Sequence, residues 1–170
     1  ADELDSIVKA AIQNARAATE LSIGRQEKFV ALDIGPTGKM LKPYGDLDFE
    51  NAVTIFAETV KLGVKHGADL IVIETMNDSY ETKAALLAAK ENSTLPVIVT
   101  NAYGENGKLM TGANPAAMIA MLEGLGVEAR ANFNQRALRR KYANVRGLCG
   151  ARGRVRLKEG IFRGTALPCS

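Results

Sequence analysis

ADLIVIETMNDSYETKAALLAAK, residues 68–90, is the stretch that decides the fold. It opens with LIVI, a short apolar run typical of a strand buried on both faces, and continues into a segment with the composition of a helix. Asp78 and Ser79 stand between the two parts and are both candidate N-caps. The stretch therefore predicts one strand, loop and helix in succession, with Glu74 at the carboxyl end of the strand.

The same alternation continues on both sides of this unit. Further strands are predicted at KFVALDIG (28–35), at LPVIVTN (95–101) and from VEARANF (127–133). Further helices are predicted over residues 1–20, 49–67 and 116–126. In the helix 49–67, one apolar stripe is formed by Val53, Phe56, Val60 and Val64.

Strands that alternate with helices predict a parallel sheet with right-handed crossovers, either closed into a barrel or left open. The segment DIGPTGKM (33–40) contains no GxGxxG loop, and Pro36 stands where a phosphate-binding helix would begin. This disfavours an open nucleotide-binding sheet. A complete (β/α)8 TIM barrel needs roughly 250 residues. The chain of 170 residues is therefore predicted to form an incomplete barrel of about four strands.

Composition indicates an ordinary globular protein. The hydrophobic share is 46%, and no apolar run approaches the roughly 20 residues of a membrane span, so no membrane partner is expected. The first residues lack the apolar core of a signal peptide, which predicts a cytoplasmic location. Cys149 and Cys169 have no CxxC spacing, so no disulfide framework is predicted.

Charge divides the chain near residue 129. Residues 1–128 hold 11 Lys and Arg against 18 Asp and Glu, whereas residues 129–170 hold 11 Lys and Arg against one acid, Glu159. The helical and strand periodicity also ends after Phe133. We therefore predict a partial β/α barrel over residues 1–129 and an irregular, basic tail over residues 130–170.

Polar residues follow the predicted strands at the end where barrel enzymes gather their functional groups. Glu74 is the first candidate for substrate binding, because a carboxylate there needs a partner and a substrate ammonium would supply one. A structural salt bridge or a helix cap is the alternative. Asp33 has the same position one strand earlier, and its alternative role is to form an Asx turn.

Four neutral residues complete the candidate substrate site. Gly35 and Thr37 belong to a rigid turn that could present backbone amides, and Thr100 and Asn101 follow the third strand as hydrogen-bonding groups; a purely structural role is the alternative for each. His66, the only histidine, is interpreted as a helix C-terminal residue rather than a ligand. No catalytic residue and no metal ligand is predicted from these patterns.

The segments ALDIGPTGKMLKPYGDLDFENA (31–52), residues 68–90 and LPVIVTNAYGENGKLMTGANPAAMIAMLEGLGVEA (95–129) resemble the homocysteine S-methyltransferase family. The resemblance covers about residues 2–129 and is strongest to the homocysteine-binding domain of cobalamin-dependent methionine synthases. It implies a (β/α)8 barrel. It also implies a methyltransferase of methionine biosynthesis, in which zinc on three cysteines lowers the pKa of the homocysteine thiol and the thiolate attacks methylcobalamin.

The resemblance also assigns residues and partners. Glu74 matches the family's glutamate that holds the amino group of homocysteine, and the turn 33–38 matches the loop at the substrate mouth. Cobalamin-binding and folate-binding modules are implied as parts of a longer protein.

The family's zinc cysteines have no match in this chain. Where the family continues GVEA into a strand with cysteine after asparagine, this chain has Phe133 after Asn132, and Cys149 and Cys169 do not form the family's adjacent pair. The family's opening strands would precede Ala1. We therefore expect a truncated, inactive fragment without zinc. Because the match and the charge balance change together, we hypothesise that the tail is translated from a shifted reading frame.

A second hypothesis is a nucleic-acid-binding protein that uses the Arg- and Gly-rich tail on a β/α scaffold. It leaves the strand-end carboxylates without a role, and the tail's aromatics, Tyr142 and Phe162, are twenty residues apart. Nucleic acid is therefore not the favoured partner. The exposed sheet edges of an incomplete barrel also predict self-association.

Overall fold

The structure is a computed structural model that describes residues 2–24, 26–127 and 129–133. In chain order its elements are α1 (Asp2–Leu21), β1 (Ala31–Ile34), α2 (Phe49–Lys65), β2 (Leu70–Met76), α3 (Ser79–Asn92), β3 (Val97–Ala102), α4 (Pro115–Gly124) and β4 (Ala129–Phe133). Both cysteines and the tail beyond Phe133 lie outside the described residues. The frame-shift and nucleic-acid hypotheses depend on that tail and stay predictions.

The four strands form one parallel sheet in the order β1-β2-β3-β4. Ile34 pairs with Ile73, and Ile73 pairs with Val99. This confirms the predicted α/β class with parallel strands. The fourth strand lies within the strand predicted from VEARANF (127–133), and its residues 130–133 belong to the segment 130–170 that was predicted to be an irregular tail.

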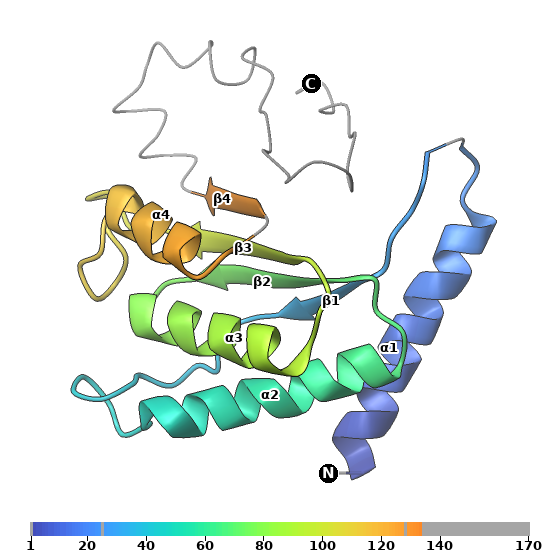
Figure 1. Ribbon diagram of the computed structural model, residues 1–170, viewed down its shortest axis with the longest axis horizontal. Coiled ribbons are helices and arrows are strands. Elements are labelled where there is room, and N and C mark those ends of the chain that lie inside the picture. Colours follow the sequence, from blue (N-terminus) through green and yellow to red (C-terminus); the bar gives the residue numbers. More distant parts are fainter. Residues whose placement is uncertain (1, 25, 128, 134–170) are drawn as a thin grey trace.

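The helices cover one face of the sheet, with α2 and α3 lying side by side across it (Figure 1). One hydrophobic cluster joins every described helix to the strands, and its members include Val8, Ile12, Phe56, Val60, Leu86, Leu122, Leu32, Ile71, Ile73, Val97 and Val99. These strand residues alternate along the chain, so they point to the same side. The opposite side of the sheet carries the remaining strand residues and is called the open face below.

The apolar stripe of α2 is only partly buried. Of the predicted stripe, Phe56 and Val60 are packed, whereas Val64 is 41% exposed. The buried face of α2 runs instead through Ala52, Phe56, Val60 and Gly63. In the last turn it is Gly63 that faces β1, so Val64 lies at the margin of the buried face. Gly63 allows a close approach, since a Cβ there would lie 2.4 Å from Leu32 Cδ2.

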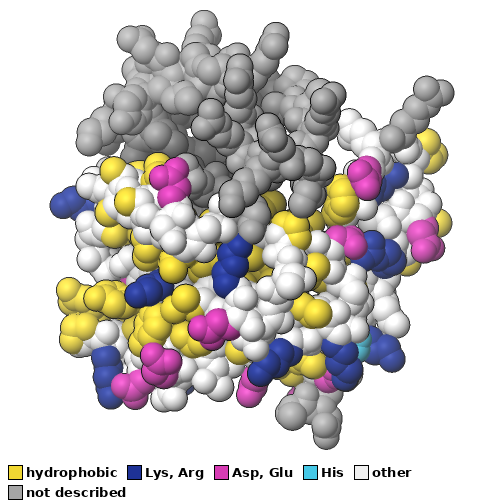
Figure 2. Space-filling model, viewed as in Figure 1, with side chains coloured by type: hydrophobic (Ala, Val, Ile, Leu, Met, Phe, Trp, Pro, Cys, Tyr) yellow, Lys and Arg dark blue, Asp and Glu magenta, His cyan; other side chains and the backbone are white. Residues whose placement is uncertain are grey.

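Charged side chains of both signs are interspersed over the helix layer (Figure 2). None of the helices in the described part of the chain is long and apolar enough to cross a membrane.

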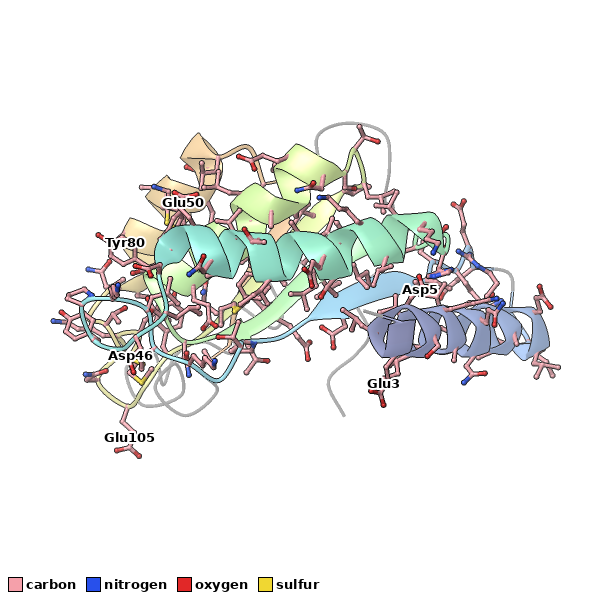
Figure 3. The ribbon with its side chains drawn as sticks, turned by 90° about the horizontal axis from the view of Figure 1, so that it is seen from below. Glu3, Asp5, Asp46, Glu50, Tyr80 and Glu105 are labelled. Atoms are coloured by element: carbon pink, nitrogen blue, oxygen red, sulfur yellow. The ribbon has the colours of Figure 1, made fainter. Side chains whose placement is uncertain are left out.

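Two carboxylates fasten α1 to the rest of the fold. Asp69 accepts hydrogen bonds from Arg16 Nη1 at 2.8 Å and from the Val30 amide at 2.7 Å. Asp5 lies on the side of α1 that faces α2 (Figure 3) and contacts Lys65 Nζ at 2.9 Å and His66 Nε2 at 2.8 Å. His66 is the C-cap residue of α2, as its position in the sequence predicts.

Acid is expected to loosen α1. Hydrogen bonds from Lys65 and His66 lower the pKa of Asp5, and the hydrogen bond from Arg16 lowers the pKa of Asp69, both below the ordinary value of 3.8. A carboxyl group with a lowered pKa stabilises the fold above its ordinary pKa, and this contribution is lost as the pH falls through the folded-state pKa. The protection factors of the α1 amides, which correct for the intrinsic exchange rate, should therefore stay high at pH 5 and fall below about pH 4.

The control for this prediction is Asp69→Asn, which should accelerate exchange in α1 already at pH 7. The idea is contradicted if α1 keeps its full protection at pH 3 while the variant also exchanges like the wild type.

Candidate functional site

The open face gathers the polar residues predicted at the strand ends. Asp33 alternates with the buried Leu32 and points away from the helices, and Glu74 does the same after Ile73. Asp33 pairs with Val72, two residues before Glu74, which puts the two carboxylate-bearing Cα atoms about 8 Å apart from strand spacing and rise. The structure thus brings these two candidates to neighbouring positions on one face.

Both carboxylates lack a partner within the described residues. Glu74 and Asp33 are exposed, and neither forms a hydrogen bond or an ion pair with any residue that the structure describes. The salt bridge, the helix cap and the Asx turn that the sequence offered as alternatives are therefore not formed there. An acceptor of this kind suits a cationic group of a ligand.

The backbone beside Glu74 is irregular. Thr75 has φ = 58°, and it is the one non-glycine residue with a positive φ in the described ranges. A β-branched residue in this conformation costs on the order of 1 kcal/mol or more. The Thr75 amide donates a hydrogen bond to Thr100 Oγ1 at 2.9 Å. Thr100, a predicted site residue, thus supports the end of the neighbouring strand.

Asn101 does not join the other candidates on the open face. It is fully buried on the helix side of β3, where its Nδ2 donates to Met76 O at 3.3 Å and to Thr82 Oγ1 at 3.0 Å. Its Oδ1 is buried without a hydrogen-bond partner among the described residues. Asn101 therefore lies on the helix side of the sheet, opposite the face that carries Asp33 and Glu74.

The turn after β1 is tied to α3. Thr37 donates both its amide and its hydroxyl to Glu81 Oε1, at 2.7 Å and 2.6 Å. Both donors are thus already used in this structure. Gly35 is exposed, and a Cβ added to it would meet nothing within 4 Å. Of these two candidates, only Gly35 has open space beside it.

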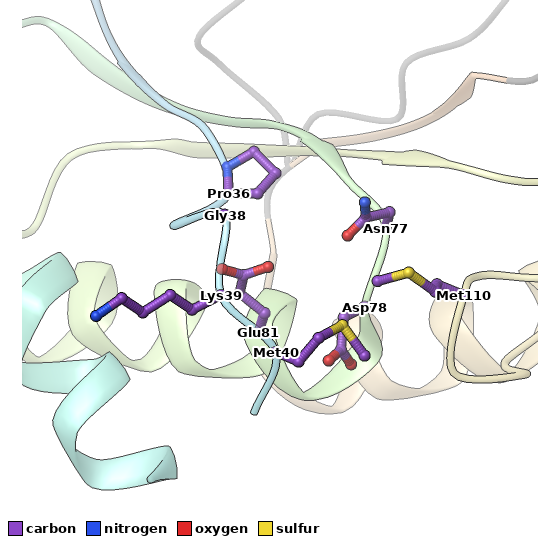
Figure 4. Close-up of a pocket in the computed structure, with 8 residues that line it drawn as sticks. All are labelled: Pro36, Gly38, Lys39, Met40, Asn77, Asp78, Glu81 and Met110. Atoms are coloured by element: carbon purple, nitrogen blue, oxygen red, sulfur yellow. The ribbon is translucent and has the colours of Figure 1, made fainter. Parts of the chain in front are cut away.

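A pocket lies between this turn and the start of α3 (Figure 4). Its lining consists of Pro36, Gly38, Lys39, Met40, Asn77, Asp78, Glu81 and Met110. Asp78 and Glu81 are each only 3% exposed. Asp78 caps α3 by accepting from the Tyr80 amide at 2.8 Å, and it also accepts from the Thr111 hydroxyl at 3.1 Å. These carboxylates thus hold three loops together.

Glu81 is not among the residues that the sequence patterns single out. A signal was present, because Asp78 and Glu81 have the spacing of a capping box, in which the N3 glutamate binds the backbone amide of the N-cap residue. The capping box predicts a different partner for Glu81 from the one observed, since Glu81 binds Thr37, which lies 44 residues away in the sequence.

Tyr103 lies in the loop after β3, and its burial raises the pKa of its hydroxyl to about 12.

The described residues do not offer a metal site. No three His, Cys, Asp or Glu side chains among them come together in a way that could hold an ion. What the open face can do chemically is accept hydrogen bonds from a cation through Asp33 and Glu74.

Comparison with known proteins gives three consistent findings. A family model described as Homocysteine S-methyltransferase matches residues 1–134. The methionine synthase of Mycobacterium leprae (strain TN) is 28% identical over 118 residues, and that of Mycobacterium tuberculosis (strain ATCC 25618 / H37Rv) is 27% identical over 118 residues. Each alignment covers 66% of this chain and 10% of the relative, so the chain spans about a tenth of those proteins.

Among solved structures, the apo form of the homocysteine methyltransferase MmuM from Escherichia coli has a similar fold. The TM-score is 0.69 at 18% identity, and the alignment covers 84% of this chain and 56% of that chain.

Proposed function

The chain belongs to the homocysteine S-methyltransferase family, and from this premise we propose that it is a segment of a homocysteine methyltransferase that binds homocysteine on its open face. Glu74 accepts the ammonium group in this proposal, and Asp33 is the second acceptor. Gly35, Thr37 and Thr100 border the same end of the sheet. Asn101 supports the site from behind.

One observation carries the proposal: Glu74 is an exposed carboxylate at the carboxyl end of β2 with no cationic partner in the described residues. Asp5 and Asp69, which hold α1 to the fold, are by contrast ion-paired. A carboxylate left without a partner at a strand end is suited to a ligand ammonium, because a charge-assisted hydrogen bond is roughly twice as strong as a neutral one.

The rest of the reaction belongs to a longer protein. We propose that the four parallel strands are part of an eight-stranded barrel, whose remaining strands would cover the open face. Methyl transfer to the homocysteine sulfur, the methylcobalamin donor, and cobalamin-binding and folate-binding modules are proposals for that longer protein. They rest on the family resemblance.

Zinc does not fit the residues that the structure describes. Zinc that activates a thiol is held by cysteine and histidine ligands, whereas the open face supplies only the carboxylate oxygens of Asp33 and Glu74. The proposed part of this chain in the reaction is therefore to bind and orient homocysteine.

Glu74→Gln tests the proposal. The wild-type chain should bind homocysteine more tightly than 4-sulfanylbutanoate, which is the same molecule without the amino group. Glu74→Gln should weaken homocysteine binding by about 10-fold or more, the effect of losing one hydrogen bond to a charged group, and should leave binding of 4-sulfanylbutanoate unchanged. Titration calorimetry under reducing conditions measures both affinities.

A matched control is Glu105→Gln, since Glu105 points into solvent from the loop after β3 (Figure 3). It should change neither affinity. Equal affinity of the wild-type chain for the two ligands would show that Glu74 does not bind the amino group.

For the residues after Ala129 we propose a shifted reading frame, motivated by the jump in positive charge there. The coding DNA decides this. If neither alternative frame downstream of Ala129 encodes the family's Asn-Cys-Ser strand, the idea fails.

A further inference from the structure

The end of β2 contains one residue more than the strand beside it. Ile73 pairs with Val99 and Met76 pairs with Asn101, so three steps along β2 correspond to two steps along β3. The extra residue falls between Ile73 and Met76, where Thr75 has φ = 58°. This is the geometry of a β-bulge.

The bulge breaks the alternation of the strand. Ile73 and Met76 are both fully buried toward the helices, and the two residues between them, Glu74 and Thr75, are both exposed. A regular strand would place one of the two toward the helices. Glu74 would face outward in a regular strand as well; the bulge is what lets Thr75 also face outward and Met76 return to the core.

Side chains of β3 support the bulge on both of its sides. On the open face, Thr100 Oγ1 accepts the Thr75 amide at 2.9 Å. On the helix side, Asn101 Nδ2 donates to Met76 O at 3.3 Å. Thr100 is only 6% exposed and Asn101 is fully buried, so both side chains are held in place by their surroundings.

We infer that Thr100 is a positioning residue for homocysteine binding: its hydroxyl fixes the left-handed conformation of Thr75 and thereby the direction of the Glu74 carboxylate. Glu74 itself forms no bond to a described residue that could fix its direction. The backbone conformation at Glu74 and Thr75 must therefore fix the direction of the Glu74 carboxylate. Thr100 is the side chain that is hydrogen-bonded to the Thr75 amide. This inference rests on the proposed function, because the benefit of the fixed direction is the hydrogen bond to the substrate ammonium.

The test compares Thr100→Val with Thr100→Ser in the full chain. Valine keeps the shape of threonine and removes the acceptor, whereas serine keeps the acceptor. In Thr100→Val the preference for homocysteine over 4-sulfanylbutanoate should fall by about 3-fold to 10-fold, and in Thr100→Ser it should stay within about 2-fold of the wild type.

Two NMR measurements at Thr75 do not depend on any ligand. Its amide should exchange faster in Thr100→Val than in Thr100→Ser, and the three-bond coupling constant that reports φ should change in Thr100→Val alone. A melting curve of each variant establishes that the fold is retained. The amide of Ile73, one step before the bulge, is the internal reference and should exchange at the wild-type rate in both variants.

Two results overturn the inference. One is an unchanged amide exchange rate and coupling constant at Thr75 in Thr100→Val. The other is a changed Thr75 with an unchanged ligand preference, in a protein where Glu74→Gln does lower that preference. If Glu74→Gln has no effect, the proposed function fails, and the measurements at Thr75 still decide whether Thr100 fixes the bulge.

Discussion

Asn101→Asp is expected to lower the free energy of unfolding by about 3 kcal/mol or more at pH 7. Asn101 is fully buried, and its Nδ2 donates to Met76 O and Thr82 Oγ1. Thr82 Oγ1 cannot reverse its role, because it already donates to Asp78 O. Aspartate would therefore bring a buried negative charge against oxygen atoms, with no cation bonded to this group of residues in the described structure.

The pH dependence of this variant has a definite sign. Burial raises the pKa of the new carboxyl group in the folded state, so the neutral form is favoured and the loss of stability grows as the pH rises. The deficit relative to the wild type should shrink as the pH falls from 7 toward 4. This is opposite to the acid sensitivity of Asp5 and Asp69, and urea titrations of both proteins at each pH separate the two effects.

The matched control is Asn106→Asp, which makes the same chemical change in an exposed loop. Asn106 Oδ1 accepts from the Lys108 amide, and a carboxylate can do the same, so the cost should stay within about 0.5 kcal/mol. If Asn101→Asp is as stable as this control at pH 7, the buried hydrogen bonds of Asn101 do not hold the strand ends.

Ile73→Ala and Val72→Ala form the second test with a large expected effect. Ile73 is fully buried beneath the helices, so its truncation should cost about 3–4 kcal/mol. Val72 is half-buried on the open face, where no described helix covers it, and its truncation should cost less than about 1 kcal/mol. Chemical denaturation measures both.

The comparison also tests what covers the open face. If a second copy of the chain packs there, the cost of Val72→Ala should rise with protein concentration, because association contributes to stability. A cost of Val72→Ala equal to that of Ile73→Ala in dilute solution would contradict the description of this face as open.

The strands and helices were predictable because their signals are local. The apolar runs that contain Ile73 and Val99 form strands, and Asp78 caps α3 as one of the two caps proposed for it. Val64 shows the limit of such signals: helical spacing puts it near the apolar side of α2, but Gly63 is the residue of that turn that packs on β1.

The placement of the candidate residues was predictable, whereas their contacts were not. Polar residues at strand ends meet at one edge of a parallel sheet, which placed Asp33, Glu74 and Thr100 together. No propensity predicts a threonine with a positive φ, so the bulge at Thr75 had no signal in the sequence. Asn101 lies two residues after the buried Val99, so alternation along β3 places it on the helix side, but its partners Met76 and Thr82 lie far from it in the sequence.

Because β2 carries one extra residue, the direction of the Glu74 side chain can change in evolution while the fold is kept. Loss of a single codon at Thr75 would restore an uninterrupted ladder between β2 and β3, and Ile73 and the strand before it would stay packed as they are. Glu74 would stay on the open face and Met76 on the helix side, so only the left-handed conformation that follows the glutamate would be lost, without a change in the core. A homologue with one residue fewer at the end of this strand is therefore expected to keep the architecture and the position of the glutamate, and to direct its carboxylate differently.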